Sequence, residues 1–373
     1  MPPIKPFFFD MTEAEIEEFT RESARVLRSG TLILGEYTER FERAFAEFIG
    51  VPHAVAVNSG SSALEFLLWI KNAAGRTVLV PTNTNFATVA AVVRAGGVVR
   101  YLDLEPETFA PSLALVRAAL DGEPEVAGVL WVHIGGVIAP EFPEVVRVCR
   151  DRRLWVLEDA AHAHGSQLGG IKAGALADGG AFSFFPTKVM TTGEGGMITL
   201  ADVDEAERAR SLRNQGKRGL KFGGLHHDFG NSSRLTEIGA VLGLIQLRKL
   251  PQMLAARQAA QAAMTRVLDR GGIRYVATRH MDAASQYKLI VLLPAGRHAD
   301  DVKQALAAAG VILGGGVYEI PCHRQPVFAG IGDGAALPNA DRWCPNHICP
   351  PLTSGMTPAE AERVGELLVK HLS

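Results

Sequence analysis

Three groups of polar residues in this sequence directly follow short apolar segments and have the chemistry of a binding site. The first is the run Asn58-Ser59-Gly60-Ser61-Ser62, which comes after the apolar residues 54–57. Glycine permits a tight backbone turn there, and the serines offer hydroxyls beside the first amides of a following helix. Such a helix N-terminus binds phosphate, although taken alone an ordinary serine cap is the commoner meaning of this pattern.

The second group is Glu158 and Asp159, which directly follow the apolar segment 154–157. A carboxylate that enters a buried site needs a partner, because an unpaired buried charge is costly. A protonated pyridine nitrogen is one such partner for Asp159. A helix cap or a structural ion pair would explain the same residue equally well.

The third group is Lys188, which follows the aromatic segment 182–185 and precedes the glycine-rich residues 193–196. A lysine that loses solvation at the end of a buried strand has an amine of lowered pKa and becomes a nucleophile. A solvated loop lysine is the commoner case. Together, however, a phosphate cradle, a carboxylate for a pyridinium and a lysine for an aldehyde are what pyridoxal phosphate requires.

The elements that must position these groups alternate between short apolar strands and helices. This alternation predicts an α/β protein with a mostly parallel sheet covered by helices on both faces. The predicted strands are 54–57, 78–80, 98–104, 126–134, 154–159, 181–185 and 196–200, after helices at 12–29 and 38–49. Ligands bind at the carboxyl ends of such strands, which is where the three groups fall.

The length of 373 residues predicts a large domain and a smaller one. We place the large cofactor-binding domain at 1–250 and a smaller α+β domain at 251–373. The division falls within a helical stretch at 232–268, and a strand at 287–293 with helices at 300–309 and 358–372 follows it.

Composition excludes several other classes of protein. A net charge of -2 and 21% charged residues do not indicate a nucleic-acid or membrane surface. The N-terminal residues predict neither a signal peptide nor a membrane span, and four cysteines are too few for a disulfide scaffold, so we expect a cytoplasmic protein. No metal site is predicted, because Cys322, His323, Cys344, His347 and Cys349 lack the close CxxC pairing of structural zinc.

Several ordered motifs resemble one known family, the DegT/DnrJ/EryC1/StrS sugar aminotransferases of fold-type I. The similar segments are LRSGTLILGEYTERFERAFAEFIGVPHAVAVNSGSSAL (27–64), VPTNTNFAT (80–88), LEDAAHAHGSQLGG (157–170), AFSFFPTKVMTTGEGGMI (181–198), LRNQG (212–216), FGNSSRLTEIGAVLGLIQL (229–247) and YEIPCHRQPVF (318–328). Since these motifs follow one another in family order over nearly the whole chain, the resemblance implies the family's fold, cofactor and activity.

The resemblance assigns roles to the three groups described above. It implies that Lys188 forms the Schiff base with pyridoxal phosphate and that Asp159 pairs with the pyridinium nitrogen. Ser61 and Ser62 occupy the positions that hold the phosphate, helped by Ser183.

Further positions that match the family depart from its commonest pattern or point to a second chain. His162 stands where glutamine is more frequent and contacts the phenolic oxygen of the cofactor; histidine can donate the same hydrogen bond. Asn85 replaces an aromatic residue that usually stacks on the pyridine ring, and the adjacent Phe86 is expected to point elsewhere. Asn231 matches an asparagine that reaches the phosphate of the neighbouring subunit, which implies a homodimer with shared active sites.

The reaction implied by the family moves an amino group from an amino acid, most often L-glutamate, to a keto-sugar. The usual acceptor is a 3-keto or 4-keto deoxysugar carried on a nucleotide. A keto-cyclitol acceptor is not separated from a nucleotide sugar by these motifs, nor is glutamine from glutamate as the donor. A related sugar dehydratase would have histidine in place of Lys188, and a non-catalytic regulatory protein would not need the complete lysine, aspartate and phosphate set.

Overall fold

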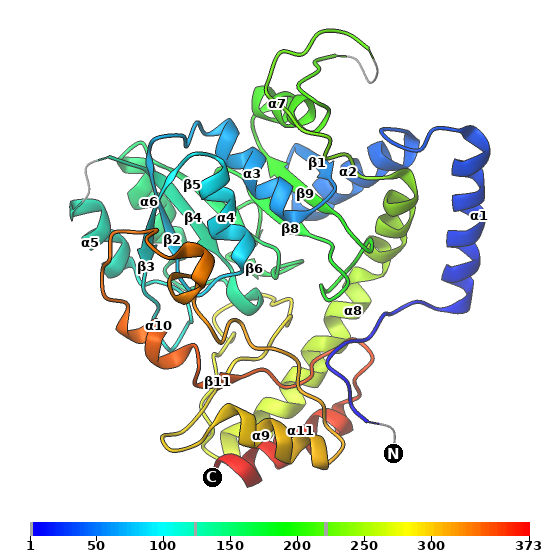
Figure 1. The fold of residues 1–373 in the computed structure, drawn as a ribbon. Coiled ribbons are helices and arrows are strands. Elements are labelled where there is room, and N and C mark those ends of the chain that lie inside the picture. The colour runs from blue at the N-terminus through cyan, green and yellow to red at the C-terminus, as the bar shows by residue number, and fades with distance from the viewer. Residues whose placement is uncertain (1–2, 123–124, 220–222) are drawn as a thin grey trace.

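The computed structural model describes residues 3–122, 125–219 and 223–373, which fold around a central β-sheet (Figure 1). Its strands are β1 (His53–Val57), β2 (Thr77–Pro81), β3 (Val98–Leu102), β4 (Val126–Val132), β5 (Trp155–Asp159), β8 (Gly180–Ser183) and β9 (Gly196–Leu200). Their order is β1-β9-β8-β5-β4-β2-β3. Strand β9 is antiparallel to β1 and β8, and the other neighbouring pairs are parallel, which confirms the predicted mostly parallel sheet.

Helices cover both faces of this sheet, because side chains alternate between the faces along each strand. On β1, Ala54 and Ala56 belong to one apolar cluster, while Val55 and Val57 belong to the other. The first cluster includes α2 (Glu36–Ile49), α5 (Leu113–Gly122), α6 (Phe142–Asp151) and part of α8 (Glu237–Arg270). The second includes α3 (Gly60–Ile70), α4 (Phe86–Arg94) and α7 (Val203–Arg213).

An aromatic cluster anchors the strand that leads to Lys188. Phe45 of α2 packs edge-on against Phe182 of β8 with 5.0 Å between ring centres, and Phe41 lies 5.3 Å from Phe184. All four rings are fully buried. The start of the lysine loop is therefore held against α2 by close packing.

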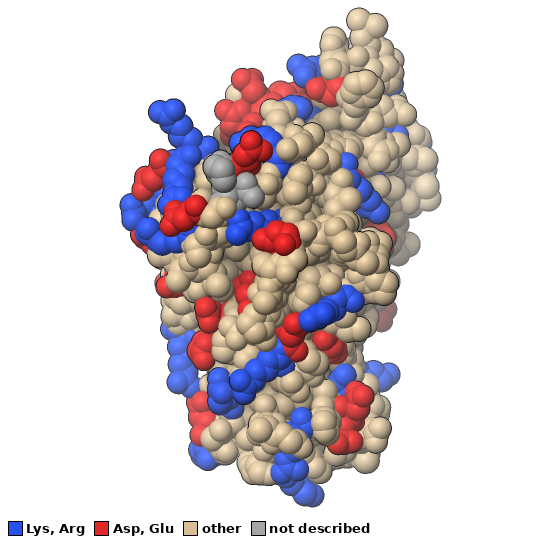
Figure 2. All heavy atoms as spheres, turned by 60° about the vertical axis from the view of Figure 1, so that its left-hand side comes forward, with Lys and Arg blue, Asp and Glu red and all other residues tan. Residues whose placement is uncertain are grey.

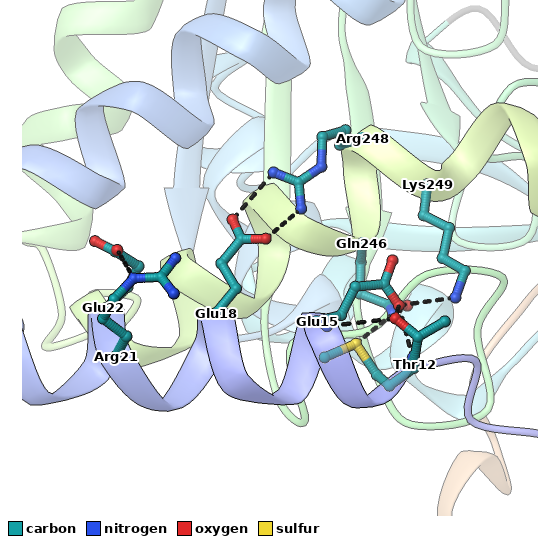
Figure 3. A network of polar contacts seen from close by, with 9 residues as sticks. Thr12, Glu15, Glu18, Arg21, Glu22, Gln246, Arg248 and Lys249 are labelled. Atoms are coloured by element: carbon teal, nitrogen blue, oxygen red, sulfur yellow. Dashed lines mark hydrogen bonds and ion pairs between the residues drawn. The ribbon is translucent and has the colours of Figure 1, made fainter.

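Helix α1 (Glu13–Ser29) lies along α8 at the side of the sheet layers and is attached to it by polar contacts (Figure 1). Arg248 donates to both carboxylate oxygens of Glu18, at 3.0 and 2.6 Å (Figure 3). Lys249 donates to Glu15 at 2.9 Å, and Glu15 also closes a capping box with Thr12 at the start of α1.

The C-terminal part of the chain has an apolar cluster of its own. It unites the second half of α8 with α9 (Ala299–Ala308) and α11 (Pro358–Leu372), and Ile4 from the N-terminal segment lies in the same cluster. Ile4 also forms a β-bridge with Val311. Helix α8 runs unbroken through residue 250, so the division of the chain at that residue stays a prediction.

The predicted strand 287–293 forms a ladder only at β10 (Val291–Leu292), which pairs with β11 (His347–Ile348). Before β10 the backbone bonds to loops; for example, Lys288 donates its N–H to the carbonyl of Gly135 at 3.1 Å. The apolar pattern indicated burial, but a ladder also requires a neighbouring strand, which the sheet order does not provide there. The remaining short elements are β6 (Gln167–Leu168), β7 (Ile171–Lys172), α10 (Pro338–Trp343) and the 3-10 turns Ile134–Gly136, Cys322–Arg324 and Pro326–Phe328.

The surface carries charges of both signs. On the face drawn in Figure 2, acidic and basic side chains are interspersed among larger uncharged areas. In the part of the chain that the structure describes, no helix has both the length and the apolar character to cross a membrane.

Candidate active site

A cavity of about 430 Å³ lies at the carboxyl ends of β5 and β8, against the N-terminal ends of α3 and α4. This volume is in the usual range for a small-molecule site. Six of the eight residues singled out from the sequence line it, namely Ser61, Asn85, Asp159, His162, Ser183 and Lys188. Ser62 and Asn231 do not line it.

Lys188 is half-buried in the loop after β8, and its Nζ lies 4.9 Å from the centre of the Tyr287 ring. Burial lowers the pKa of the Lys188 amine to about 8; the Asp159 carboxylate opposes this shift and the charge of Lys288 adds to it. A substantial fraction of the amine is therefore neutral near physiological pH. Neutral lysine is the form that attacks carbonyl carbons.

The Asp159 carboxylate is buried at the end of β5, with 5% of the residue exposed. One oxygen accepts a hydrogen bond from the Thr88 hydroxyl at 2.7 Å, and the other accepts the N–H of Ala161 at 3.1 Å. Burial raises the pKa of Asp159, and these two hydrogen bonds and the Lys188 charge oppose the shift. A cation inside the cavity would stabilise this carboxylate more than hydrogen bonds alone.

His162 is buried beside the same cavity, and its surroundings select one tautomer. Its Nδ1 accepts the N–H of Gly135 at 3.2 Å, so the ring proton resides on Nε2. This Nε2 lies 3.3 Å from the Tyr318 hydroxyl, and the ring stacks on Tyr287 with 4.3 Å between centres. Burial lowers the pKa of His162 well below its usual value. The residue therefore presents a neutral N–H donor, which the expected contact with a phenolic oxygen requires.

The two serines at the start of α3 differ in their surroundings. Ser59 is the N-cap, and its hydroxyl accepts the N–H of Ser62 at 3.1 Å. The Ser62 hydroxyl donates to the Asn58 side chain at 2.8 Å, whereas Ser61 lines the cavity. Ser62 thus contributes to the turn, and Ser61 is the serine of this pair that lines the cavity.

The backbone at the start of α3 lies very close to β8. A Cβ atom on Gly60 would lie 2.8 Å from the Cβ of Ser183, so glycine is required for the two segments to meet. The first amides of a helix have no acceptor within the helix. The amides of α3, together with Ser61 and Ser183, therefore form a suitable phosphate cradle.

Asn85 lines the cavity and also caps α4, because its side-chain oxygen accepts the N–H of Ala87 at 3.0 Å. Tyr318, an aromatic residue, lines the same cavity. As expected, Phe86 points elsewhere and stacks on Phe328 with 5.5 Å between ring centres.

Asn231 lies outside the cavity of its own chain and is exposed. Its N–H donates to the Leu212 carbonyl at 2.7 Å, and its side-chain oxygen accepts the N–H of Ser232 at 2.7 Å. Its role at the phosphate of a second chain stays a prediction.

Sequence reasoning missed three side chains of this site: Thr88, Tyr287 and Tyr318. Tyr318 begins the segment 318–328, which resembles the family, but no role had been assigned to it. Tyr287 belonged to a predicted strand, and Thr88 lies one helical turn after Asn85. Thr88 ends the segment 80–88, which also resembles the family, so Thr88 and Tyr318 carried a usable signal in the sequence and Tyr287 did not.

The cysteines and histidines of the C-terminal part have other contacts. His323 contacts the Thr82 hydroxyl at 2.7 Å and Asp341 at 2.9 Å, and all four cysteines are buried and free. Within residues 3–122, 125–219 and 223–373, no group of three or more His, Cys, Asp or Glu side chains is placed to hold a metal ion.

A lysine amine, a buried carboxylate and a helix N-terminus around one cavity of this sheet define a pyridoxal-phosphate enzyme of fold-type I. The chain belongs to the DegT/DnrJ/EryC1/StrS aminotransferase family, whose model matches residues 13–369. It is a pyridoxal-phosphate-dependent aminotransferase.

Individual relatives agree with this assignment. The chain is 38% identical over 229 residues to GDP-perosamine synthase of Caulobacter vibrioides, a match that covers 60% of each chain. It is 33% identical to dTDP-3-amino-3,4,6-trideoxy-alpha-D-glucose transaminase of Streptomyces venezuelae, over 96% of this chain and 93% of the relative. The structure of DesI in the presence of its TDP-sugar product matches with a TM-score of 0.87 and 28% identity, over 99% of this chain and 93% of the other.

The residues present fit this cofactor. When bound, pyridoxal phosphate supplies an aldehyde for amine exchange and a ring that stores electrons. Asp159 is a buried carboxylate without an ion pair among the described residues, as a pyridinium partner should be. Lys188 would hold the aldehyde carbon, and the amides of α3 with Ser61 and Ser183 would hold the phosphate.

Proposed function

We propose that this enzyme transfers the amino group of L-glutamate to a nucleotide-linked keto-sugar, a 3-keto or 4-keto deoxysugar. The observation that carries the reaction class is the shared cavity of Lys188 and Asp159, in which a lysine of lowered pKa lies near a buried carboxylate. The acceptor is supported by the names of its relatives, two of which refer to GDP-linked and dTDP-linked amino sugars and one to a TDP-sugar product.

In this proposal each polar residue has a defined task. Lys188 would hold the cofactor through its aldehyde carbon and would move a proton between the α-carbon of the donor and C4′. Asp159 keeps the pyridine nitrogen protonated. His162 would donate its Nε2–H to the phenolic oxygen, Ser61 and Ser183 would hold the phosphate, and Asn85 would form the wall beside the ring.

We further propose a homodimer in which Asn231 completes the phosphate site of the partner chain. Large apolar side chains are exposed near this residue: Phe229 is fully exposed and Leu225 is 76% exposed. Phe185, which lines the cavity, is 44% exposed. Burial of such side chains across a two-fold interface would stabilise the dimer. We place the dimer in the cytoplasm.

The test is incubation of the purified holoenzyme with L-glutamate and a panel of keto-sugar nucleotides, with amino-sugar products detected by mass spectrometry. Parallel reactions replace glutamate with glutamine and replace the sugar with a keto-inositol. Amination of a nucleotide sugar with glutamate supports the proposal. Amination of only the cyclitol, or transfer only from glutamine, would contradict the acceptor or the donor.

A further inference from the structure

A second, smaller cavity of about 230 Å³ adjoins the active site. Tyr318 lines both cavities, and Tyr287, which lines the smaller cavity, has a lysine amine near its ring from each of two segments. The Lys188 amine lies 4.9 Å and the Lys288 amine 5.7 Å from the centre of the Tyr287 ring. A group bound in the smaller cavity would therefore contact residues that lie beside the reactive lysine.

Arg257, on α8, is a buried cation that lines this cavity, with 6% of the residue exposed. Its guanidinium donates to the backbone carbonyls of Gln286 at 3.1 Å and Leu352 at 2.7 Å, while its Nε has no hydrogen-bond partner. Among the described residues it forms no ion pair, and burial lowers its pKa to about 10, although Tyr287 and the charge of Asp10 oppose this shift. A buried guanidinium without a counter-ion is costly, and a bound anion would remove this cost.

Lys288 is the second cation of the cavity and is half-buried. Its amine donates to the Gly315 carbonyl at 3.3 Å, and no carboxylate of the described residues pairs with it. A Cβ atom on Gly314 would lie 3.1 Å from Pro6 and 3.3 Å from the amine, so a side chain at this position would crowd the amine. No Asp or Glu lines the cavity, which leaves two positive charges without a negative one.

We propose that Arg257 and Lys288 form an anion subsite that binds a carboxylate of the amino-acid donor. The volume of about 230 Å³ is below that of typical ligand pockets and suits a small acid better than a nucleoside diphosphate. A planar guanidinium beside an ammonium is also a common arrangement for carboxylate recognition. The identity of the donor rests on the function proposed above, whereas the anion subsite itself rests on the unpaired cations.

The kinetic test uses Lys288→Gln holoenzyme and follows each half-reaction separately by the absorbance of the cofactor. The glutamate concentration at half-maximal rate should rise about tenfold, which corresponds to about 1.4 kcal/mol of binding free energy. The half-reaction with the keto-sugar nucleotide should keep its concentration dependence. Lys370→Gln removes the same charge from the exposed surface of α11 and should change neither half-reaction.

A binding measurement separates this subsite from the proposed function. Calorimetry of the holoenzyme with 2-oxoglutarate should show binding that weakens about tenfold in Lys288→Gln and also weakens in Gly314→Ala, which narrows access to the amine. Inorganic phosphate serves as the comparison anion. If Lys288→Gln binds 2-oxoglutarate as tightly as the natural protein, the subsite is wrong. If the Lys288→Gln substitution impairs only the sugar half-reaction, or only the binding of phosphate, the assignment of the subsite to the donor is wrong. That result would leave the proposed sugar transamination itself unaffected.

Discussion

Lys188 and Asp159 are each held in the folded chain in a state that favours a bound cofactor. Burial lowers the pKa of the lysine amine and raises the pKa of the carboxyl group, so each group is biased toward its neutral form. A protonated pyridine nitrogen would reverse the bias at Asp159, because an opposite charge stabilises the carboxylate. An aldehyde would react with the neutral amine of Lys188.

The rate at which the apoenzyme takes up pyridoxal phosphate should rise as the pH rises through about 8. The pKa of Lys188 is lowered from 10.5 to about 8, so the amine is protonated and unreactive below this pH and neutral above it. Absorbance during reconstitution measures the rate. Borohydride reduction and peptide mapping should then place the pyridoxyl group on Lys188, and its discovery on another lysine would refute the assignment.

Asp159→Asn should retain the cofactor but lose transamination by roughly 10²–10³-fold, the usual effect of removing one preorganised electrostatic partner. A neutral amide cannot keep the pyridine nitrogen protonated. Single-turnover kinetics with glutamate measures the loss. Asp151→Asn changes an exposed aspartate of α6 in the same way and should leave the rate of transamination unchanged. Near-normal turnover of Asp159→Asn would show that this carboxylate is structural.

At the scale of elements, the apolar patterns of the central sheet predicted its strands within a few residues, whereas the apolar segment 287–293 forms a strand only at Val291–Leu292 and a weakly apolar helix was missed. Helix α7 was not predicted, because its sequence VDEAERARSLR is largely charged. It is nevertheless held by three buried apolar residues, Ala206, Ala209 and Leu212, at helical spacing, and by Asp202 as N-cap. Alanine spacing is a weak signal because alanine occurs on either face of a helix.

One buried carboxylate joins the start of α8 to the start of α2. The Glu237 side chain accepts the amides of Gly35 at 2.9 Å, Tyr37 at 2.8 Å and Thr38 at 3.0 Å. Glu237→Gln should therefore reduce the free energy of unfolding by about 1–3 kcal/mol, since an amide accepts less strongly from these donors and brings its own N–H groups into a buried site. Urea denaturation measures the change.

Glu36→Gln is the matched control, because this residue lies in the first turn of the same α2 helix but is exposed. Its effect should stay within about 0.5 kcal/mol. Equal effects of the two substitutions would show that the buried contacts of Glu237 are not what stabilises the start of α2.

At the scale of the whole molecule, the active site is expected to need two chains. We expect Lys188→Ala to be inactive and Asn231→Ala to be strongly impaired through the partner's phosphate site. Mixing and refolding the two variants should restore activity, because some mixed dimers contain one active site with both natural residues. Light scattering supplies the second measurement. A fully active monomer, or no recovery from two separately impaired variants, would contradict the shared site.

The sequence by itself determined most of the sheet, most of the helices on its two faces and six of the residues around the cavity. Apolar periodicity reports burial directly, and chemical groups at strand ends must converge in a parallel sheet. Only the tertiary structure decided which of these groups face the cavity: Ser61 faces it, while the Ser62 hydroxyl bonds to Asn58. It also placed Arg257 and Lys288, which are 31 positions apart, in one cavity without a carboxylate. Such contacts join residues distant in the chain, and neither composition nor local spacing carries information about them.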